Sequence, residues 1–357
     1  MVPLPISKKL RVGLVGYGYW GQNMLRNLTS HRGFEVVGVV DSSPPALETC
    51  SIHFPYIKTF GDLAQMFSVA KPEVMVICAP PAAHCNLAIE CMNRGSHVLV
   101  EKPLARSVEE CNRILDVAKK LSRKVMVDHT FLYHPAIEYI GAEVFNGSLG
   151  IPLYYDSIRV NFGGFQRQVN VLWDLAPHDL SILDFIVRGV MPISVFAVGK
   201  KFLSHDVESL CHVTLNYPND FIAHIHLNWI APVKVRSITL GGSLRMLIYD
   251  ENLPTEKIKV YDRGITGPNT DSLNDARVKY LLGGMISPAL PNREALGGLI
   301  ADLYSHVAYD KPTISDGECG KRVVQLLEMA THSMATGQTV KPDAVESIFT
   351  KEKNRAA

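Results

Sequence analysis

Hydrophobic residues in the first third of the chain occur in short runs that alternate with stretches of helical periodicity. The runs end at turn-forming or charged residues and predict strands at 12–15, 34–40, 74–78, 98–100 and 125–127. Between them, apolar residues spaced three or four apart predict helices around 24–28, 87–92 and 108–118. Strands that alternate with helices of this length indicate βαβ units. We therefore predict an α/β domain with a doubly wound parallel sheet over residues 1–131.

The pattern changes after residue 131 and becomes rich in strands. A predicted helix at 135–145 precedes strands expected at 153–161, 193–198, 209–215, 221–229, 233–240 and 244–249. Several of these strands alternate in polarity, which predicts an α+β domain (132–357) with a large open, mostly antiparallel sheet, packed on one face only. The free face could bind substrate or another subunit, and we expect a homodimer or homotetramer.

Helices are also expected in the second domain, and two segments carry little pattern. The predicted helices cover 179–187, 293–309 and 318–334. Residues 264–291 form a long, weakly patterned stretch that we interpret as a loop able to cap a site, and residues 351–357 are expected to fray.

A glycine-rich turn joins the first predicted strand to the first predicted helix. It reads Gly16-x-Gly18-Tyr19-Trp20-Gly21. The first glycine allows a tight turn, the second lets backbone amides approach a pyrophosphate, and the third lets the helix pack closely on the sheet. Because the motif lies between a strand and a helix, it predicts a dinucleotide site in a Rossmann domain.

An acid at the end of the second strand indicates which dinucleotide binds. Asp41 lies about 20 residues beyond the glycines, where a carboxylate accepts hydrogen bonds from the adenosine ribose. The same carboxylate would repel a 2′-phosphate, and serines rather than arginines follow it. We therefore expect NAD rather than NADP.

The apolar run at residues 98–100 stops at Glu101-Lys102-Pro103. Ligands of open parallel sheets bind just beyond the carboxyl ends of the strands, so Lys102 is expected to project into that crevice. Pro103 removes a ladder donor and ends the strand, and a Lys-Pro bond is one of the few that can be cis at low cost.

Composition and charge exclude several partners. Lys and Arg total 36 against 35 for Asp and Glu, so no net charge draws the chain to nucleic acid or to an anionic membrane. The seven cysteines show no metal or disulfide spacing, and neither a signal-peptide h-region nor a membrane-spanning run is visible. We interpret the chain as a soluble, cytoplasmic protein.

Three motifs resemble the glucose-fructose oxidoreductase, inositol dehydrogenase and MocA family of sugar and cyclitol oxidoreductases. Besides the glycine turn they are the Glu-Lys-Pro triplet, the run Ala79-Pro80-Pro81-Ala82-Ala83-His84 and residues 173–179 with the sequence WDLAPHD. The resemblance extends from Gly16 to about Val340. It implies hydride transfer to or from a nicotinamide. It further implies a cofactor site lined by the motif residues, including Ala79, Pro80, Glu101, Lys102 and Pro103.

The resemblance also implies the catalytic residues. Oxidation of a secondary alcohol needs a base for the hydroxyl proton, and imidazole has a suitable pKa. His178 would be that base, and Asp174 would orient it from the same helical face if Pro177 lies in the first turn. Lys102 would hydrogen-bond the same hydroxyl.

Other polar residues fit either a functional or a structural role. His84 either lines the cofactor crevice or caps a helix, and Arg159 either contacts substrate or is a solvated strand charge. His129, Tyr133 and Asn161 are further candidates for substrate contacts. His224 and His226 resemble a metal pair, but no third ligand is near in sequence, so we expect no metal.

The resemblance is greatest to family members that oxidise C3 of a UDP-linked N-acetylhexosamine or its uronic acid. It rests on residues 128–133 (DHTFLY) and 172–179 (LWDLAPHD). We therefore predict an NAD-dependent dehydrogenase of a sugar, with a nucleotide sugar as substrate, serving polysaccharide biosynthesis. Three alternatives remain: a 3-keto sugar reductase or cyclitol dehydrogenase, an NAD-dependent glycosidase, and a non-catalytic NAD-binding sensor.

Overall fold

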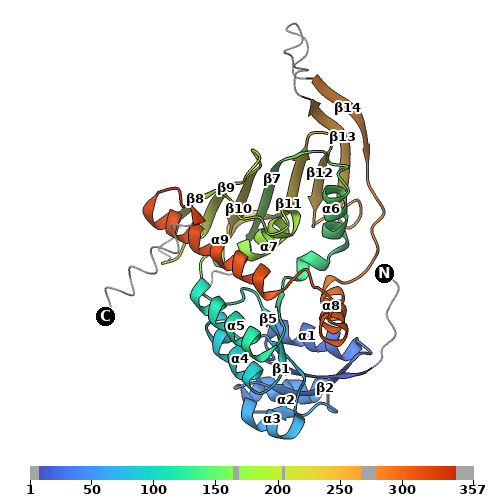
Figure 1. The fold of residues 1–357 in the computed structure, drawn as a ribbon, viewed down its shortest axis with the longest axis vertical. Helices are drawn as coiled ribbons and strands as arrows, with labels where there is room; N and C mark the ends of the chain where they lie inside the picture. Colours follow the sequence, from blue (N-terminus) through green and yellow to red (C-terminus); the bar gives the residue numbers. More distant parts are fainter. Residues whose placement is uncertain (1–7, 164–168, 203–205, 267–278, 343–357) are drawn as a thin grey trace. The chain divides into compact units, whose positions relative to one another are not determined.

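The chain folds into two compact units, which the computed structural model describes over residues 8–163, 169–202, 206–266 and 279–342 (Figure 1). The first unit comprises residues 1–134 and 293–324, and the second comprises 135–292 and 325–357. The sequence places a single boundary at residue 131 and gives no sign that residues 293–324 belong with the first unit. Across the described ranges, no helix has both the length and the apolar character needed to cross a membrane.

The first unit is built on a six-stranded parallel sheet in the order β3-β2-β1-β4-β5-β6. Of its central strands, β4 is fully buried and β1 is buried except at Arg11, because nearly all their residues are apolar, which is typical of a sheet covered on both faces. The strands are β1 (Leu10–Val15), β2 (Phe34–Val40), β3 (Thr59–Phe60), β4 (Val74–Ile77), β5 (His97–Glu101) and β6 (Val125–Asp128).

Helices of the first unit follow the strands, as expected for βαβ units. Helix α1 packs against β2 and α8, whereas α4 packs against β5 and α5. The sequence predicts neither α2, which begins at the apparent turn of Pro44, nor α3. The helices are α1 (Tyr19–Ser30), α2 (Pro44–His53), α3 (Leu63–Ala70), α4 (Pro81–Asn93), α5 (Val108–Leu121), the 3-10 helix η1 (Thr130–Tyr133) and α8 (Ala295–Tyr309).

The second unit contains an eight-stranded sheet in the order β14-β13-β12-β11-β7-β10-β9-β8. All neighbours are antiparallel except β7 and β10, so the predicted mostly antiparallel sheet is confirmed. The strands are β7 (Pro152–Phe162), β8 (Ser194–Lys200), β9 (Leu210–Asn216), β10 (Ile222–Asn228), β11 (Ile230–Gly242), β12 (Met246–Asp250), β13 (Ile258–Thr266) and β14 (Lys279–Ile286).

The segment predicted as a long loop at 264–291 contains regular structure. Residues 279–286 form β14, which pairs with the end of β13. The prediction failed because glycines at 264, 283 and 284 weaken the strand pattern. Residues 267–278, on which the rest of that prediction depends, and the predicted frayed end at 351–357 lie outside the described residues.

Helices cover one face of the second sheet. Helix α7 (Val171–Ile186) packs on β7, β9 and β10 and beside α6 (Pro135–Phe145), as Figure 1 shows. Helix α9 (Gly317–Thr336) contributes residues to both units. The inward positions of β7 therefore face α7, which determines the surroundings of the residues discussed below.

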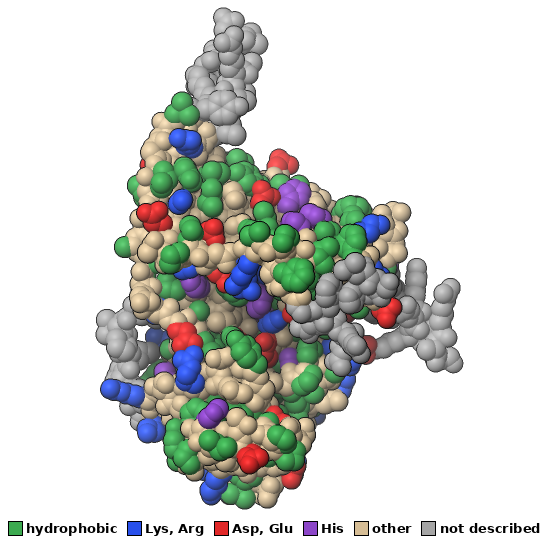
Figure 2. Space-filling view, turned by 180° about the vertical axis from the view of Figure 1, so that it is seen from behind, with side chains coloured by type: hydrophobic (Ala, Val, Ile, Leu, Met, Phe, Trp, Pro, Cys, Tyr) green, Lys and Arg blue, Asp and Glu red, His purple; other side chains and the backbone are tan. Residues whose placement is uncertain are grey.

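The other face of the second sheet is exposed. Figure 2 shows histidine side chains among hydrophobic ones on this unit. The imidazoles of His212 on β9 and His226 on β10 stack with ring centroids 4.2 Å apart. Ile158 on β7 and Val198 on β8, the strands that flank this pair, are partly exposed.

Candidate active site

The glycine turn has the geometry of a phosphate cradle. Gly16 has a φ of +91°, and a Cβ there would lie 2.4 Å from the carbonyl oxygen of Cys78. A Cβ on Gly21 would lie 2.1 Å from the carbonyl oxygen of Gly16, so α1 can approach only because this residue is glycine. A Cβ on Gly18 would meet no atom within 4 Å. The turn therefore has open space next to Gly18, where a pyrophosphate needs to approach the backbone.

Asp41 connects the end of β2 to this turn. Its carboxylate accepts a hydrogen bond from the Tyr17 amide at 2.7 Å and another from the Ser43 amide at 2.8 Å. A carboxylate has about four acceptor sites, so it retains capacity for ribose hydroxyls. This arrangement fits the predicted contact with an adenosine ribose.

Alanine substitutions at two of the glycines should separate packing from cofactor binding. We expect Gly21→Ala to lower the free energy of unfolding by about 1–3 kcal/mol, because its Cβ would overlap backbone. Gly18→Ala should fold normally, because its Cβ meets open space, yet bind NAD at least about tenfold more weakly. Thermal melts and calorimetric titration with NAD measure the two effects, and equal melting temperatures for the two variants would contradict this distinction.

Lys102 directly follows β5, and its peptide bond to Pro103 is cis. The side chain of His84 on α4 contacts the backbone of this segment. Its ring nitrogens lie 2.9 Å from the carbonyl oxygen of Pro103 and 2.7 Å from that of Ala79, and the side chain is fully buried. His84 therefore links the turns that follow β4 and β5. Cofactor contact by His84 stays a prediction.

The end of β6 contributes two buried polar residues. Asp128 accepts a hydrogen bond from the Trp20 indole at 2.6 Å and another from the Thr130 hydroxyl. Both ring nitrogens of the neighbouring His129 are buried and have no hydrogen-bond partner among the described residues. Burial, together with the nearby Lys102 charge, lowers the pKa of His129 to about 3. Lys102, Asp128 and His129 thus meet at the carboxyl edge of the sheet.

His129 should make folding stability depend on pH. Its pKa falls from the ordinary 6.5 to about 3 in the folded protein, so below pH 6.5 the unfolded chain binds a proton that the native state excludes. Stability is therefore intact above pH 6.5 and is lost as the pH falls toward about 3. We expect wild type to lose about 1 kcal/mol more per pH unit in this window than His129→Gln. Urea unfolding at several pH values measures the difference, and parallel curves would contradict it.

Tyr133 lies in a buried hydrogen-bond network of the first unit. Its hydroxyl donates to the Asp302 carboxylate of α8 at 2.7 Å and lies 3.3 Å from the Thr313 hydroxyl. The ring is almost fully buried. These contacts give Tyr133 a structural role in the first unit. Its contact with substrate stays a prediction.

Helix α7 carries both residues of the predicted acid and base pair. Asp174 and His178 are four residues apart on one continuous helix and therefore share a face. The Asp174 carboxylate also accepts a hydrogen bond from the Trp229 indole at 3.1 Å. The condition given for this pair, that Pro177 lies in the first turn, is not met. The helix begins at Val171, because the Asn170 side chain caps it by accepting from the Trp173 amide, and Pro177 lies in its interior.

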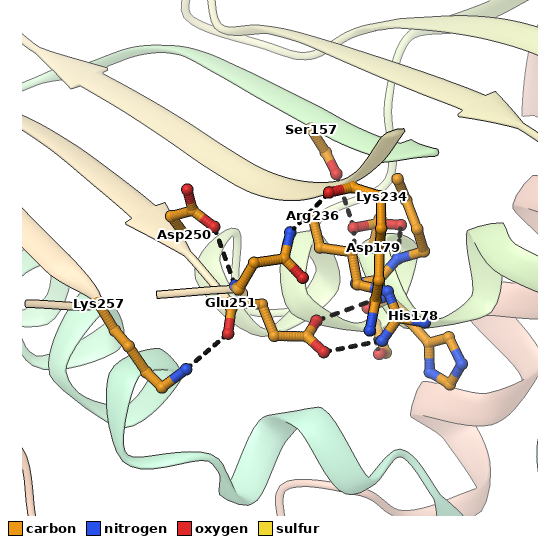
Figure 3. A network of polar contacts seen from close by, with 11 residues as sticks. Ser157, His178, Asp179, Lys234, Arg236, Asp250, Glu251 and Lys257 are labelled. Carbon is orange, nitrogen blue, oxygen red and sulfur yellow. Dashed lines mark hydrogen bonds and ion pairs between the residues drawn. The ribbon is translucent and has the colours of Figure 1, made fainter. Parts of the chain in front are cut away.

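A buried ionic network fixes the residue after His178. Asp179 accepts from Arg159 Nε at 2.7 Å and from the Ser157 hydroxyl at 2.6 Å. Arg159 also lies 3.6 Å from Glu251, which binds Arg236 at 2.7 Å. In Figure 3 the His178 ring points away from this network. The network therefore anchors α7 to the sheet directly beside the imidazole.

The structure gives Arg159 a buried position rather than that of a solvated strand charge. Only 4% of it is exposed. Burial disfavours its charged form, but the Asp179 carboxylate outweighs this effect and raises the pKa of Arg159. Asn161 lies two residues further on the same face of β7, and its buried Oδ1 has no hydrogen-bond partner within the described part of the chain. Substrate contacts of Arg159 and Asn161 stay predictions.

Sequence reasoning missed Asp128 as a partner of Trp20 and Asp179 as a buried anchor. The second had a signal: an acid in a strongly apolar helical stretch (LAPHDLSIL) needs a buried partner. The first had none, because 108 positions separate the two residues. Among the described residues, no group of three or more His, Cys, Asp or Glu could hold a metal.

The parallel sheet, the open glycine turn and the acid at the end of β2 define a dinucleotide-binding protein. Residues 10–129 match the model of the oxidoreductase family with an NAD-binding Rossmann fold (GFO/IDH/MocA), and residues 159–248 match the GFO/IDH/MocA C-terminal domain. The chain belongs to this family and is an NAD-binding oxidoreductase, which confirms the predicted family, fold class and cofactor.

The sequence similarity to relatives with described activities covers most of this chain. It is 25% identical over 323 residues to the UDP-N-acetylglucosamine 3-dehydrogenase of Acidithiobacillus ferrooxidans, covering 88% of this chain and 94% of the relative. The solved structure of that enzyme is similar with a TM-score of 0.78 at 22% identity, covering 92% and 99% of the two chains. The WlbA dehydrogenase of Bordetella pertussis, solved with NADH and UDP-GlcNAcA, has a TM-score of 0.75 at 18% identity, covering 94% and 99%.

Proposed function

We propose that this protein is an NAD-dependent dehydrogenase that oxidises the C3 hydroxyl of a nucleotide-linked sugar. The observation that carries the proposal is the placement of Asp174 and His178 on one face of α7, in a chain that carries Lys102 at the carboxyl edge of the cofactor sheet. The similarity to a UDP-N-acetylglucosamine 3-dehydrogenase supports the choice of substrate.

In the proposed mechanism, His178 takes the proton of the substrate hydroxyl. Asp174 orients the imidazole and stabilises its charged form. The buried network around Asp179 keeps the helix rigid at this point, so the ring is held in place before substrate binds. The role of His178 is therefore that of a general base.

Lys102 is proposed to donate a hydrogen bond to the same hydroxyl and to stabilise negative charge that develops on its oxygen. NAD, when bound, supplies the nicotinamide that accepts the hydride. Gly16, Gly18 and Gly21 shape the turn that receives the pyrophosphate, and Asp41 is proposed to bind the adenosine ribose.

The experiment is an assay of NADH formation from NAD with UDP-N-acetylglucosamine, its uronic acid, free N-acetylglucosamine and myo-inositol. We expect NADH with a nucleotide sugar, and a 3-keto product identified by nuclear magnetic resonance. NADH with inositol alone would favour a cyclitol dehydrogenase, and NADH oxidation by a 3-keto sugar alone would favour a reductase. Cleavage of a coloured glycoside without net NADH would favour a glycosidase. If none of these compounds reacts, the proposal is overturned.

We also propose that two or four copies of this chain associate through the exposed face of the second sheet. The partly exposed apolar side chains of Ile158, Phe196 and Val198 and the His212–His226 pair lie on this face. Sedimentation velocity should give a dimer or tetramer, and Ile158→Lys should shift it to a smaller species. A wild-type monomer at micromolar concentration would contradict this assembly.

A further inference from the structure

A hydrogen bond between Trp20 and Asp128 joins residues on the two sides of the first unit's central strands. Trp20 is the second residue of α1, directly after the turn that follows β1, and Asp128 is the last residue of β6. Strands β4 and β5 lie between β1 and β6, and three strand spacings amount to about 14 Å. Nevertheless, Trp20 Nε1 donates to Asp128 Oδ2 at 2.6 Å. The side chains of Trp20 and Asp128 therefore together bridge the carboxyl ends of β4 and β5.

Asp128 holds the indole from a rigid position. Its carboxylate is 2% exposed, and it accepts a second hydrogen bond from the Thr130 hydroxyl. In the parallel sheet Asp128 is in register with Glu101, the residue before Lys102. Tyr19, the neighbour of Trp20, is 84% exposed. Of the neighbouring residues Tyr19 and Trp20, Trp20 is the one whose side chain a buried partner holds in place.

The polarity of the cofactor places this contact beside the nicotinamide. Asp41, which is suited to the adenosine ribose, lies at the end of β2 on one side of β1. A pyrophosphate bound at the glycine turn would direct the nicotinamide half to the other side of β1, toward β4 and β5. Lys102 follows β5 in that region.

We propose that Trp20 and Asp128 form a clamp for the nicotinamide half of NAD. The Trp20 ring forms one wall of the nicotinamide subsite, and Asp128 is a positioning residue that fixes the ring through its indole nitrogen. This inference depends on the use of NAD but not on the proposed sugar substrate, so its failure would leave that proposal standing.

The test compares NADH with ADP-ribose, which carries the adenosine ribose and pyrophosphate contacts but lacks the nicotinamide. We expect Trp20→Phe and Asp128→Ala each to weaken NADH binding about tenfold, and ADP-ribose binding to change less than about twofold. The double variant should bind NADH no more weakly than the weaker single variant, because both changes remove the same contact. Asp128→Asn, which keeps an acceptor for the indole, should stay within about threefold of wild type.

Energy transfer from tryptophan to bound NADH provides a second measurement. It should be strong in wild type, lower in Asp128→Ala at saturating NADH, and lowest in Trp20→Phe, which also gives the background from Trp173 and Trp229. If Asp128→Ala does not fold, Trp20→Phe and Asp128→Asn decide by the same comparison of ligands. Equal losses for NADH and ADP-ribose, additive losses in the double variant, or unchanged NADH binding in Trp20→Phe would each overturn the clamp.

Discussion

Replacing Lys102 with methionine is expected to lower kcat for the nucleotide sugar about 10²–10⁴-fold while the affinity for NAD changes little. Methionine matches the length of the side chain but has no proton donor, so it cannot stabilise charge on the substrate oxygen. The residue directly follows β5 at the edge where Asp128 and His129 also lie. Steady-state kinetics by NADH absorbance and calorimetric titration with NAD measure the two quantities.

The control for this experiment is Lys120→Met, which removes a lysine from the exposed side of α5. It should leave kcat and KM within about twofold of wild type, because surface substitutions away from structural features have small effects. The proposed role of Lys102 fails if Lys102→Met keeps more than a tenth of wild-type kcat with full occupancy by NAD.

Removing Arg159 should produce one of the largest losses of stability available from a single substitution. Arg159→Leu leaves the Asp179 carboxylate in the interior without its cation, and breaking a buried pair in this way costs about 3–5 kcal/mol. Asp179→Leu should cost a similar amount for the complementary reason. Because an apolar pair can replace a buried ion pair, the double variant should lose less than the sum of the single losses. Urea unfolding followed by the fluorescence of buried Trp229 measures these differences.

The matched control is the exposed pair of Arg94 and Glu90 at the C-terminal end of α4, whose side chains are 37% and 44% exposed. Arg94→Leu should change the unfolding free energy by less than about 1 kcal/mol, because water screens an exposed pair. If Arg94→Leu and Arg159→Leu lower the free energy of unfolding equally, burial does not explain the contribution of the Arg159–Asp179 pair to stability. Strictly additive losses in the Arg159 and Asp179 variants would show that the two residues do not act as a pair.

Most of the fold could be predicted because the pattern of apolar residues identifies the strands of both sheets. Strand β4 consists of four buried apolar residues, and in β10 buried residues alternate strictly with residues that are half-buried or exposed. The start of α7 was not predictable in the same way. Its residues are apolar on nearly all sides, which hides the helical period, and Pro177 imitates a first turn although it lies inside the helix.

The candidate site could be predicted only where the sequence carries a local signal. The glycine turn, Asp41 and the Glu-Lys-Pro triplet each combine a strand end with a characteristic residue. The contact between Trp20 and Asp128 and the pairing of Arg159 with Asp179 join distant positions. Such contacts depend on strand order and register, which a single sequence does not contain.

Residues 293–324 belong to the first unit although they follow the strands of the second unit in the chain. This order affects how the protein folds during synthesis and which fragments can be expressed alone. The Arg26 side chain of α1 binds Glu294, Tyr133 binds Asp302, and the Tyr304 hydroxyl donates to the Lys8 carbonyl. On the ribosome the nucleotide-binding half therefore stays incomplete until residue 324 has been synthesised, after every strand of the other sheet. A gene fragment that ends at residue 134 lacks α8, so this half of the molecule can be isolated only if the later segment is supplied.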